Sequence, residues 1–457
     1  MLKRILTLVL ALILIFCVAG CDIKSGADLP EYSKKEFEIA GFVSPREVSE
    51  ESFQTYKDAG FNLVAFGSVE EEWSSDIQYY LGSNITKKAL DICKKLGLKA
   101  DLQFGAGWVV DDIEGEGYYS EKPFSQLDIY GDYKDIITGI HIYDEPNKDA
   151  IDTCANKTFI EDFKNTYPNA SYVINITPKY AGSTPYGFVT YDQLVEYYSE
   201  NIMSQFEKPY ISVDYYPFPS EESGGYARRQ DLLITYNTIA NAAKKYNAKK
   251  RMILQASTGA EFAESLTEAD MRFQVNMALA FGADQLQYYC YTVPLYYDYN
   301  YCVMTREDTP SDVYYWLKDI HKEIQSYADV ILSYDWADVT AVIANNFSAN
   351  YDINSIRMKD LVAFEDSEHY ITAASTADLV ISRFESDEYG EAFMLVNYSE
   401  DRENTNTATV TLKNCKKVAI YGGNNYNGTP KIVKLDDQGQ FAVDLAYGEG
   451  VFVAPII

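Results

Sequence analysis

The chain has 457 residues, a formal net charge of −29 and only 39 Lys and Arg. This acidic balance excludes a protein that tracks nucleic-acid phosphates, because such proteins need a basic surface. With 7 Cys that lack CxxC spacing and only 3 His, the sequence predicts no metal site, no cofactor and no Ser-His-Asp triad. A disulfide between Cys290 and Cys302 stays open, since spacing alone does not determine it.

The N-terminus reads as an export segment. Lys3 and Arg4 precede an apolar run over 5–19, and Cys21 follows the small residues 18–20. This pattern resembles the lipobox of bacterial lipoproteins, in which the cysteine is lipidated. A plain signal peptide or a single anchor helix is the alternative, but the run is short for a membrane span. We predict a lipoprotein signal at 1–21, lipidation at Cys21, a tether at 22–35 and a place on the extracytoplasmic face of a bacterial membrane.

Residues 36–329 alternate between predicted strands and helices. Strands are predicted at 37–43, 62–66, 99–104, 140–143, 171–174, 210–213, 251–254 and 285–289. Helices are predicted at 49–59, 86–96, 124–137, 157–166, 191–203, 227–246, 267–281 and 311–327. Eight strand–helix pairs are typical of a (β/α)8 TIM barrel. An open doubly wound sheet is the competitor, but no Gly-rich phosphate loop follows the first strand.

The pattern changes over 330–457. Short alternating runs at 339–344, 379–384, 392–398, 408–412, 417–421 and 450–453 are separated by Gly, Asn and Asp turns. Helical periodicity is absent there. This texture predicts a C-terminal antiparallel β-sandwich.

The stretch 139–147 places two adjacent carboxylates, Asp144 and Glu145, directly after a predicted strand, and Pro146 then stops that strand. The structural alternative is a solvated turn in which Asp144 caps the next helix. In a TIM barrel, however, strand ends carry the catalytic groups.

The other predicted strand ends carry amides, a second carboxylate and aromatic rings. These residues are Gln103, Trp108, Asn175, Tyr180, Asp214, Tyr216, Gln255, Tyr289 and Tyr291. Acids for a glycosidic oxygen, amides for hydroxyls and rings for sugar faces are what a carbohydrate site needs.

Glycoside cleavage requires two carboxyl groups with different protonation states. We predict Glu145 as the general acid, because burial at a strand end and the neighbouring Asp144 would both raise its pKa. Asp214 is the predicted partner, with a structural turn before Tyr-Tyr-Pro as the alternative. Asp144 joins the amides and rings as a predicted substrate-binding residue.

Residues 37–327 resemble the (β/α)8 glycoside hydrolases of the large retaining clan that includes β-galactosidases. The matching pieces are Tyr-Asp-Glu-Pro at 143–146, 175–180, Asp-Tyr-Tyr-Pro at 214–217, Gln255, 274–291 and Thr-Arg-Glu-Asp-Thr-Pro at 305–310. The resemblance implies that Glu145 is the acid/base. Asp144 stands where the clan usually has an Asn that holds the substrate's 2-hydroxyl.

The sequence departs from the clan at the seventh strand, where Gln255 replaces the nucleophilic Glu. A neutral amide cannot form the covalent glycosyl intermediate. Three outcomes stay open: an inverting mechanism with Asp214 or Asp144 as base, a substitute nucleophile, or a barrel that binds glycan without cutting it. Glu261 and Glu264 lie in the following loop, where a solvated rim is the favoured interpretation.

These features predict an exported, lipid-anchored glycoside hydrolase that acts on an extracellular glycan. The alternative is a non-catalytic surface glycan-binding lipoprotein on the same barrel, which Gln255 favours. A third hypothesis, an assembly role centred on the sandwich, leaves the aromatic strand ends without a purpose. The expected partners are a carbohydrate and, through Cys21, a membrane.

Overall fold

The structure is a computed structural model that describes residues 29–66, 84–103, 123–126, 130–220, 228–294, 297–343, 364, 367–369, 371–403, 405–423 and 426–456. The predicted signal segment, Cys21 and Trp108 lie outside these residues, as does the side chain of Gln103. Within the described ranges, no helix has both the length and the apolar character needed to span a bilayer.

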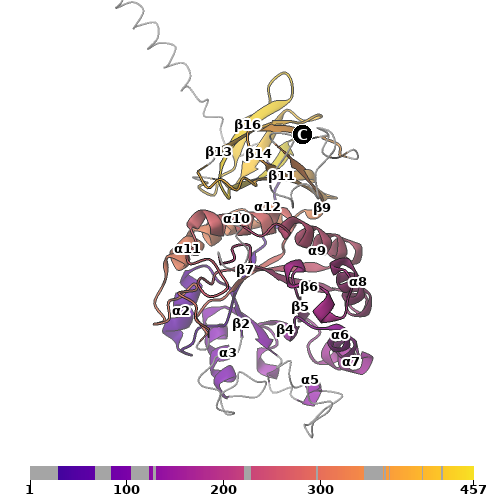
Figure 1. Cartoon of the computed structure of the whole chain (residues 1–457), viewed down its shortest axis with the longest axis vertical. Coiled ribbons are helices and arrows are strands. Elements are labelled where there is room, and N and C mark those ends of the chain that lie inside the picture. The colour runs from indigo at the N-terminus through magenta and orange to yellow at the C-terminus, as the bar shows by residue number, and fades with distance from the viewer. Residues whose placement is uncertain are drawn as a thin grey trace, which may run out of the picture.

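Eight parallel strands close into a barrel in sequential order, and β8 pairs with β1 (Figure 1). The strands are β1 (Glu38–Phe42), β2 (Leu63–Ala65), β3 (Lys99–Gln103), β4 (Ile137–Asp144), β5 (Ser171–Ile176), β6 (Tyr210–Tyr215), β7 (Lys249–Gln255) and β8 (Gln285–Tyr289). The predicted TIM barrel is confirmed. Each strand is enclosed by helices on its outer face, which explains why the strands are short and mostly apolar.

The helices around the barrel are α2 (Glu50–Asp58), α3 (Asn84–Leu96), α5 (Pro123–Gln126), α6 (Lys148–Cys154), α7 (Lys157–Thr166), α8 (Tyr191–Asn201), α9 (Leu232–Tyr246), α10 (Glu268–Ala280), α11 (Asp312–Gln325) and α12 (Ala328–Ile331). Capping boxes begin α2 at Ser49, α8 at Thr190 and α10 at Thr267.

The helix predicted over 124–137 is wrong in its length. Only α5 is α-helical in the described part of that range, and β4 already begins at Ile137. The Asp162 carboxylate accepts hydrogen bonds from the amides of Phe124 and Ser125, which satisfies the start of this one-turn helix. Gly131 lies in a separate 3₁₀ turn, where its low helix propensity carries no cost.

The C-terminal part forms two antiparallel sheets, so the predicted β-sandwich is confirmed. One sheet has the order β15-β14-β17-β12-β11-β9 and the other β10-β13-β16. Their bounds are β9 (Asp335–Val342), β10 (Thr372–Ser375), β11 (Leu379–Ser386), β12 (Gly390–Asn397), β13 (Thr405–Thr411), β14 (Lys417–Tyr421), β15 (Lys431–Lys434), β16 (Gln440–Ala446) and β17 (Gly450–Ile456). Sequence patterns did not indicate β10, β15 and β16.

The sandwich packs against the outside of the helix ring, beside α9, α10 and α12, and leaves the centre of the barrel in view (Figure 1). All residues of α10 from Asp270 through Ala280 except Arg272 are buried, because the helix lies between β7 and the sandwich strands β11, β12 and β17. Because the sandwich lies outside the helix ring, it leaves the strand ends of the barrel accessible (Figure 1).

Candidate active site

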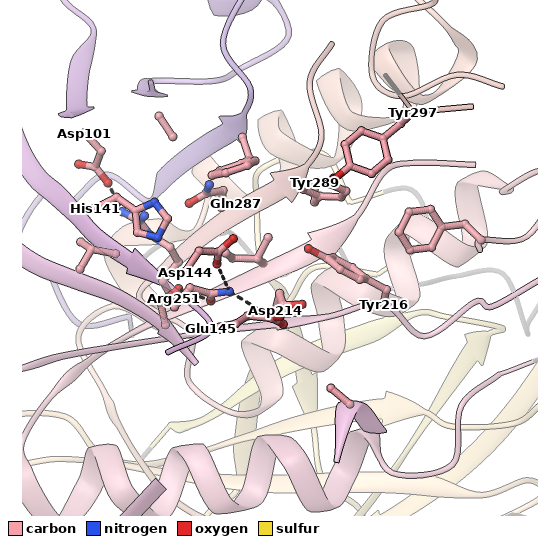
Figure 2. A pocket seen from close by; sticks show the side chains of 18 of the residues that line it. Asp101, His141, Asp144, Glu145, Asp214, Tyr216, Arg251, Gln287, Tyr289 and Tyr297 are labelled. Carbon is pink, nitrogen blue, oxygen red and sulfur yellow. Dashed lines mark hydrogen bonds and ion pairs between the residues drawn. The ribbon is translucent and has the colours of Figure 1, made fainter. Parts of the chain in front are cut away.

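A pocket of about 360 Å³ opens among the carboxyl ends of the barrel strands. This is the face on which TIM barrels carry their catalytic groups. Figure 2 shows carboxylates, a histidine, an arginine, an amide and aromatic rings around it. Of the predicted site residues, Asp144, Glu145, Asn175, Tyr180, Asp214, Tyr216 and Tyr289 line this one pocket.

The end of β4 delivers Glu145 in a strained turn. Its φ is 50°, in the left-handed region that residues with a side chain seldom occupy. The turn is held by a 2.9 Å hydrogen bond from the Glu145 amide to the Asn175 carbonyl. The next helix, α6, is capped by Asn147 and not by Asp144. The alternative role of Asp144 as the cap of the next helix is therefore wrong, and this exposed residue lines the pocket.

Asn175 joins two of the carboxylates through one nitrogen. Its Nδ2 donates to Asp144 Oδ1 at 3.0 Å and to Asp214 Oδ1 at 2.8 Å. Its Oδ1 accepts from Ser212 Oγ at 3.0 Å, which fixes the orientation of the amide. The pairing of Asp144 with Asn175 across β4 and β5 brings these groups into register. The two aspartates therefore form one hydrogen-bonded unit on three adjacent strands.

Burial and mutual repulsion shift the protonation of the carboxyl groups. Burial raises the pKa of Glu145 above its ordinary value, and Asp144 raises it further, while hydrogen bonds from Tyr186 and Thr177 lower it. Burial, followed by Glu145 and Asp144, raises the pKa of Asp214 well above its ordinary range. Carboxyl groups so arranged retain protons to higher pH than exposed ones.

Aromatic rings form one wall. Tyr216 and Tyr289 lie with ring centroids 5.4 Å apart, and Phe262 stands edge-on to Tyr216 at the same separation. On the other side Tyr180 is covered by the Arg229 guanidinium, 4.0 Å from the ring centroid. Half-buried tyrosines of this kind offer an apolar face together with a polar tip, which suits a sugar ring.

The rim beside this wall contains residues that were not among the predicted substrate contacts. Glu261 lines the pocket, and its Oε1 accepts a 2.9 Å hydrogen bond from the Tyr299 hydroxyl. Tyr299 in turn lies 3.4 Å from the Tyr289 hydroxyl, and its ring stacks on Tyr297. These contacts join loops that are distant in sequence, so no local signal marks them. Glu264 is exposed, bonds to Asn300 and is not part of the pocket lining.

The floor of the pocket is also polar and was not predicted. His141 and Gln287 line it, and beneath them Asp101 forms a buried ion pair with Arg251. Arg251 Nε also donates to Gln285 Oε1 at 2.7 Å. This ion pair fills the barrel interior below the pocket. Both charged groups are buried, and each has the other as its partner.

Two predicted substrate contacts are not in the pocket. Gln255 is fully buried, and its side chain bonds to the backbone of Phe218 in both directions, at 2.9 Å each, and to the Ser257 carbonyl at 3.2 Å. Tyr291 is buried against Tyr56 and Phe61 in the core. The expectation that they bind sugar hydroxyls is corrected, because neither side chain has a polar atom exposed to a ligand.

Cys290 and Cys302 are buried free thiols with their sulfurs 3.2 Å apart, and Ser257 Oγ lies 3.5 and 3.4 Å from them. The two cysteines for which the sequence left a disulfide open are therefore neighbours in space, with both thiols free. Within the residues that the structure describes, no group of three or more His, Cys, Asp or Glu is arranged to hold a metal ion.

No family model and no curated protein matches this sequence. Among solved structures, a family 39 glycoside hydrolase from the gut symbiont Bacteroides cellulosilyticus WH2 is similar, with a TM-score of 0.52 and 12% identity, covering 93% of this chain and 83% of that one. A catalytic mutant of a family 42 β-galactosidase from G. stearothermophilus has a TM-score of 0.54 and 8% identity, covering 93% of this chain and 100% of that one. At these identities the likeness is one of fold.

Proposed function

We propose that this protein is a glycoside hydrolase, exported and lipid-anchored, that cleaves O-glycosidic bonds of an extracellular glycan. The observation that carries the proposal is the set of three carboxyl groups, Asp144, Glu145 and Asp214, in one aromatic-walled pocket at the strand ends of the barrel. The similar solved structures are glycoside hydrolases on the same fold. Export and lipidation at Cys21 rest on the N-terminal sequence pattern.

Glu145 is the general acid in this proposal. Its raised pKa keeps a proton available for the leaving oxygen, and its half-buried position beside Tyr186 restricts the carboxyl to one direction. The base must be ionised. Asp214 is buried and its pKa lies well above its ordinary range, so it keeps its proton and does not act as the base. The base in this proposal is the exposed Asp144, which accepts a hydrogen bond from the same Asn175 amide.

The missing nucleophile favours inversion of the anomeric centre. A retaining enzyme needs a carboxylate that attacks the sugar, and Gln255 is both neutral and bonded to backbone. Proton NMR of the first-formed product tests this. The inverted anomer is expected; the retained anomer would show that another carboxylate, Glu261 foremost, attacks the sugar.

The central test is Glu145→Gln, assayed on a panel of 4-nitrophenyl glycosides and on oligosaccharides. Loss of general acid catalysis lowers kcat by about 10²–10⁴-fold, with the largest effect on poor leaving groups. Glu200→Gln, on the exposed surface of α8, is the matched control and retains the rate of the wild type. Full turnover by Glu145→Gln would overturn the assignment.

The second candidate function is glycan binding without cleavage, which the position of Gln255 favours. It predicts sugar binding by calorimetry together with no hydrolysis of any substrate in the panel. Hydrolysis that depends on Glu145 excludes it.

A further inference from the structure

The floor of the pocket has two buried polar atoms without partners. Gln287 is 2% exposed, and its Oε1 forms no hydrogen bond with any part of the chain that the structure describes. His141 Nε2 is also buried and likewise has no hydrogen-bond partner among the described residues. Both side chains line the pocket (Figure 2). Buried polar atoms in native proteins nearly always have a partner, and for atoms that line a pocket this partner is a ligand or the ordered water that a ligand displaces.

The space above these atoms exists because small side chains replace the usual bulky ones. TIM-barrel interiors are normally filled by layers of branched apolar residues. Here the smaller Ala65 and Ser212 line the same cavity as His141 and Gln287. The buried ion pair below stops a ligand from passing further into the barrel.

The charges of the lining restrict the ligand. Among the described residues that line the pocket, the carboxyl-bearing side chains outnumber the guanidinium-bearing ones, Arg229 and Arg251. Arg251 is paired with Asp101. Arg229 covers the Tyr180 ring and donates from Nε to the Tyr216 carbonyl. Arg251 is therefore neutralised by its partner and Arg229 is held by these two contacts, while an anionic sugar would meet more carboxyl groups than guanidinium groups.

We propose that His141 and Gln287 form a terminal-sugar subsite, in which a hydroxyl at the buried end of the sugar donates to Gln287 Oε1 and accepts from His141 Nε2–H. The occupant is a neutral or amine-bearing sugar at the non-reducing end of a glycan, and uronic or sulfated sugars are excluded. This inference rests on the proposed function for the glycan itself. It adds that the glycan enters the pocket by its terminal sugar, that this sugar carries no negative charge, and that His141 and Gln287 select it.

The test measures binding, so it does not depend on turnover. Methyl glycosides of neutral, amino and uronic sugars are titrated into the full-length protein by calorimetry, followed by deoxy analogues of the tightest binder. In the wild type, removing one particular hydroxyl weakens binding tenfold or more, and the uronate does not bind. In Gln287→Met, the parent sugar and that deoxy analogue bind equally, because the acceptor for the hydroxyl has been removed.

Gln54→Met on the exposed surface of α2 is the control and keeps the wild-type preference. If Gln287→Met misfolds by circular dichroism, His141→Phe provides the same comparison at the other partner. Sugar binding in which no hydroxyl depends on Gln287 or His141, or equal binding of uronates, would overturn the subsite and leave the proposed function standing. Absence of both binding and hydrolysis across the panel would overturn both.

Discussion

Glu145 is surrounded by influences of opposite sign on its pKa. Burial and Asp144 raise it, and the Tyr186 hydroxyl, which donates to Oε2 at 3.1 Å, lowers it. Asp144→Asn should therefore lower the pKa of Glu145 and Tyr186→Phe should raise it. Carbon NMR of labelled carboxyl groups, assigned with Glu145→Gln, measures both shifts. Shifts of equal sign would show that these contacts do not govern the acid.

Asp214 makes stability depend on pH in an unusual direction. Its pKa is raised in the folded state, so above the ordinary value of 3.8 the folded protein holds a proton that the unfolded chain has released. The stabilisation is complete below that value and is lost as pH rises through the folded pKa. Asp214→Asn retains an acceptor for Asn175 and should remove this loss, measured as the difference in denaturant midpoint between pH 4 and pH 8. An unchanged difference would place the titration elsewhere.

At the scale of elements, the register of β3 and β4 positions the buried ion pair of Asp101 and Arg251 under the pocket. Gly139 pairs with Asp101, and a Cβ at Gly139 would lie 2.7 Å from Asp101 Oδ1. Gly139→Ala should displace the carboxylate from Arg251 and destabilise folding by about 1–3 kcal/mol. Thermal and urea unfolding measure the loss. Gly131→Ala, where nothing lies within 4 Å of the added Cβ and φ is outside the left-handed region, as it is at Gly139, is the control. Equal losses in both would show that the ion pair tolerates the methyl group.

The sequence predicted the barrel well, because its strands are nearly continuous apolar runs and its helices carry capping signals. It also identified the β4, β5 and β6 ends, where Glu145, Asn175 and Asp214 follow those runs directly. It could not predict the floor, since Gln287 and His141 line one pocket only after β8 closes the barrel beside β1. Gln255 is a case in which the sequence predicted a ligand contact that the structure does not have. Its side-chain amide forms hydrogen bonds with backbone groups of the loop after β6 and is not available to a ligand.

On the scale of the whole molecule, α10 connects the barrel to the sandwich. On one side Gln274 holds the Gln255 backbone, with Oε1 2.7 Å from its amide nitrogen and Nε2 3.0 Å from its carbonyl. On the other side Asn276 donates to the Gly448 carbonyl at 2.8 Å, and Asp270 pairs with Arg402 at 3.0 Å. The polar residues of this buried helix are thus divided between the barrel and the sandwich, so we expect the two parts to unfold together.

Arg228 is the residue whose removal tests that cooperativity. It is 3% exposed, lies between the rings of Phe273 and Tyr398 at 4.4 and 4.2 Å, and donates to the carbonyls of Tyr398 and Ser399. Arg228→Ala loses both ring contacts and two charged hydrogen bonds, a destabilisation of about 2–4 kcal/mol. Calorimetry should then show the sandwich unfolding before the barrel. Lys157→Ala, on the exposed face of α7, should keep the wild-type transition. A single unshifted transition in Arg228→Ala would mean that the remaining α10 contacts hold the two parts together without it.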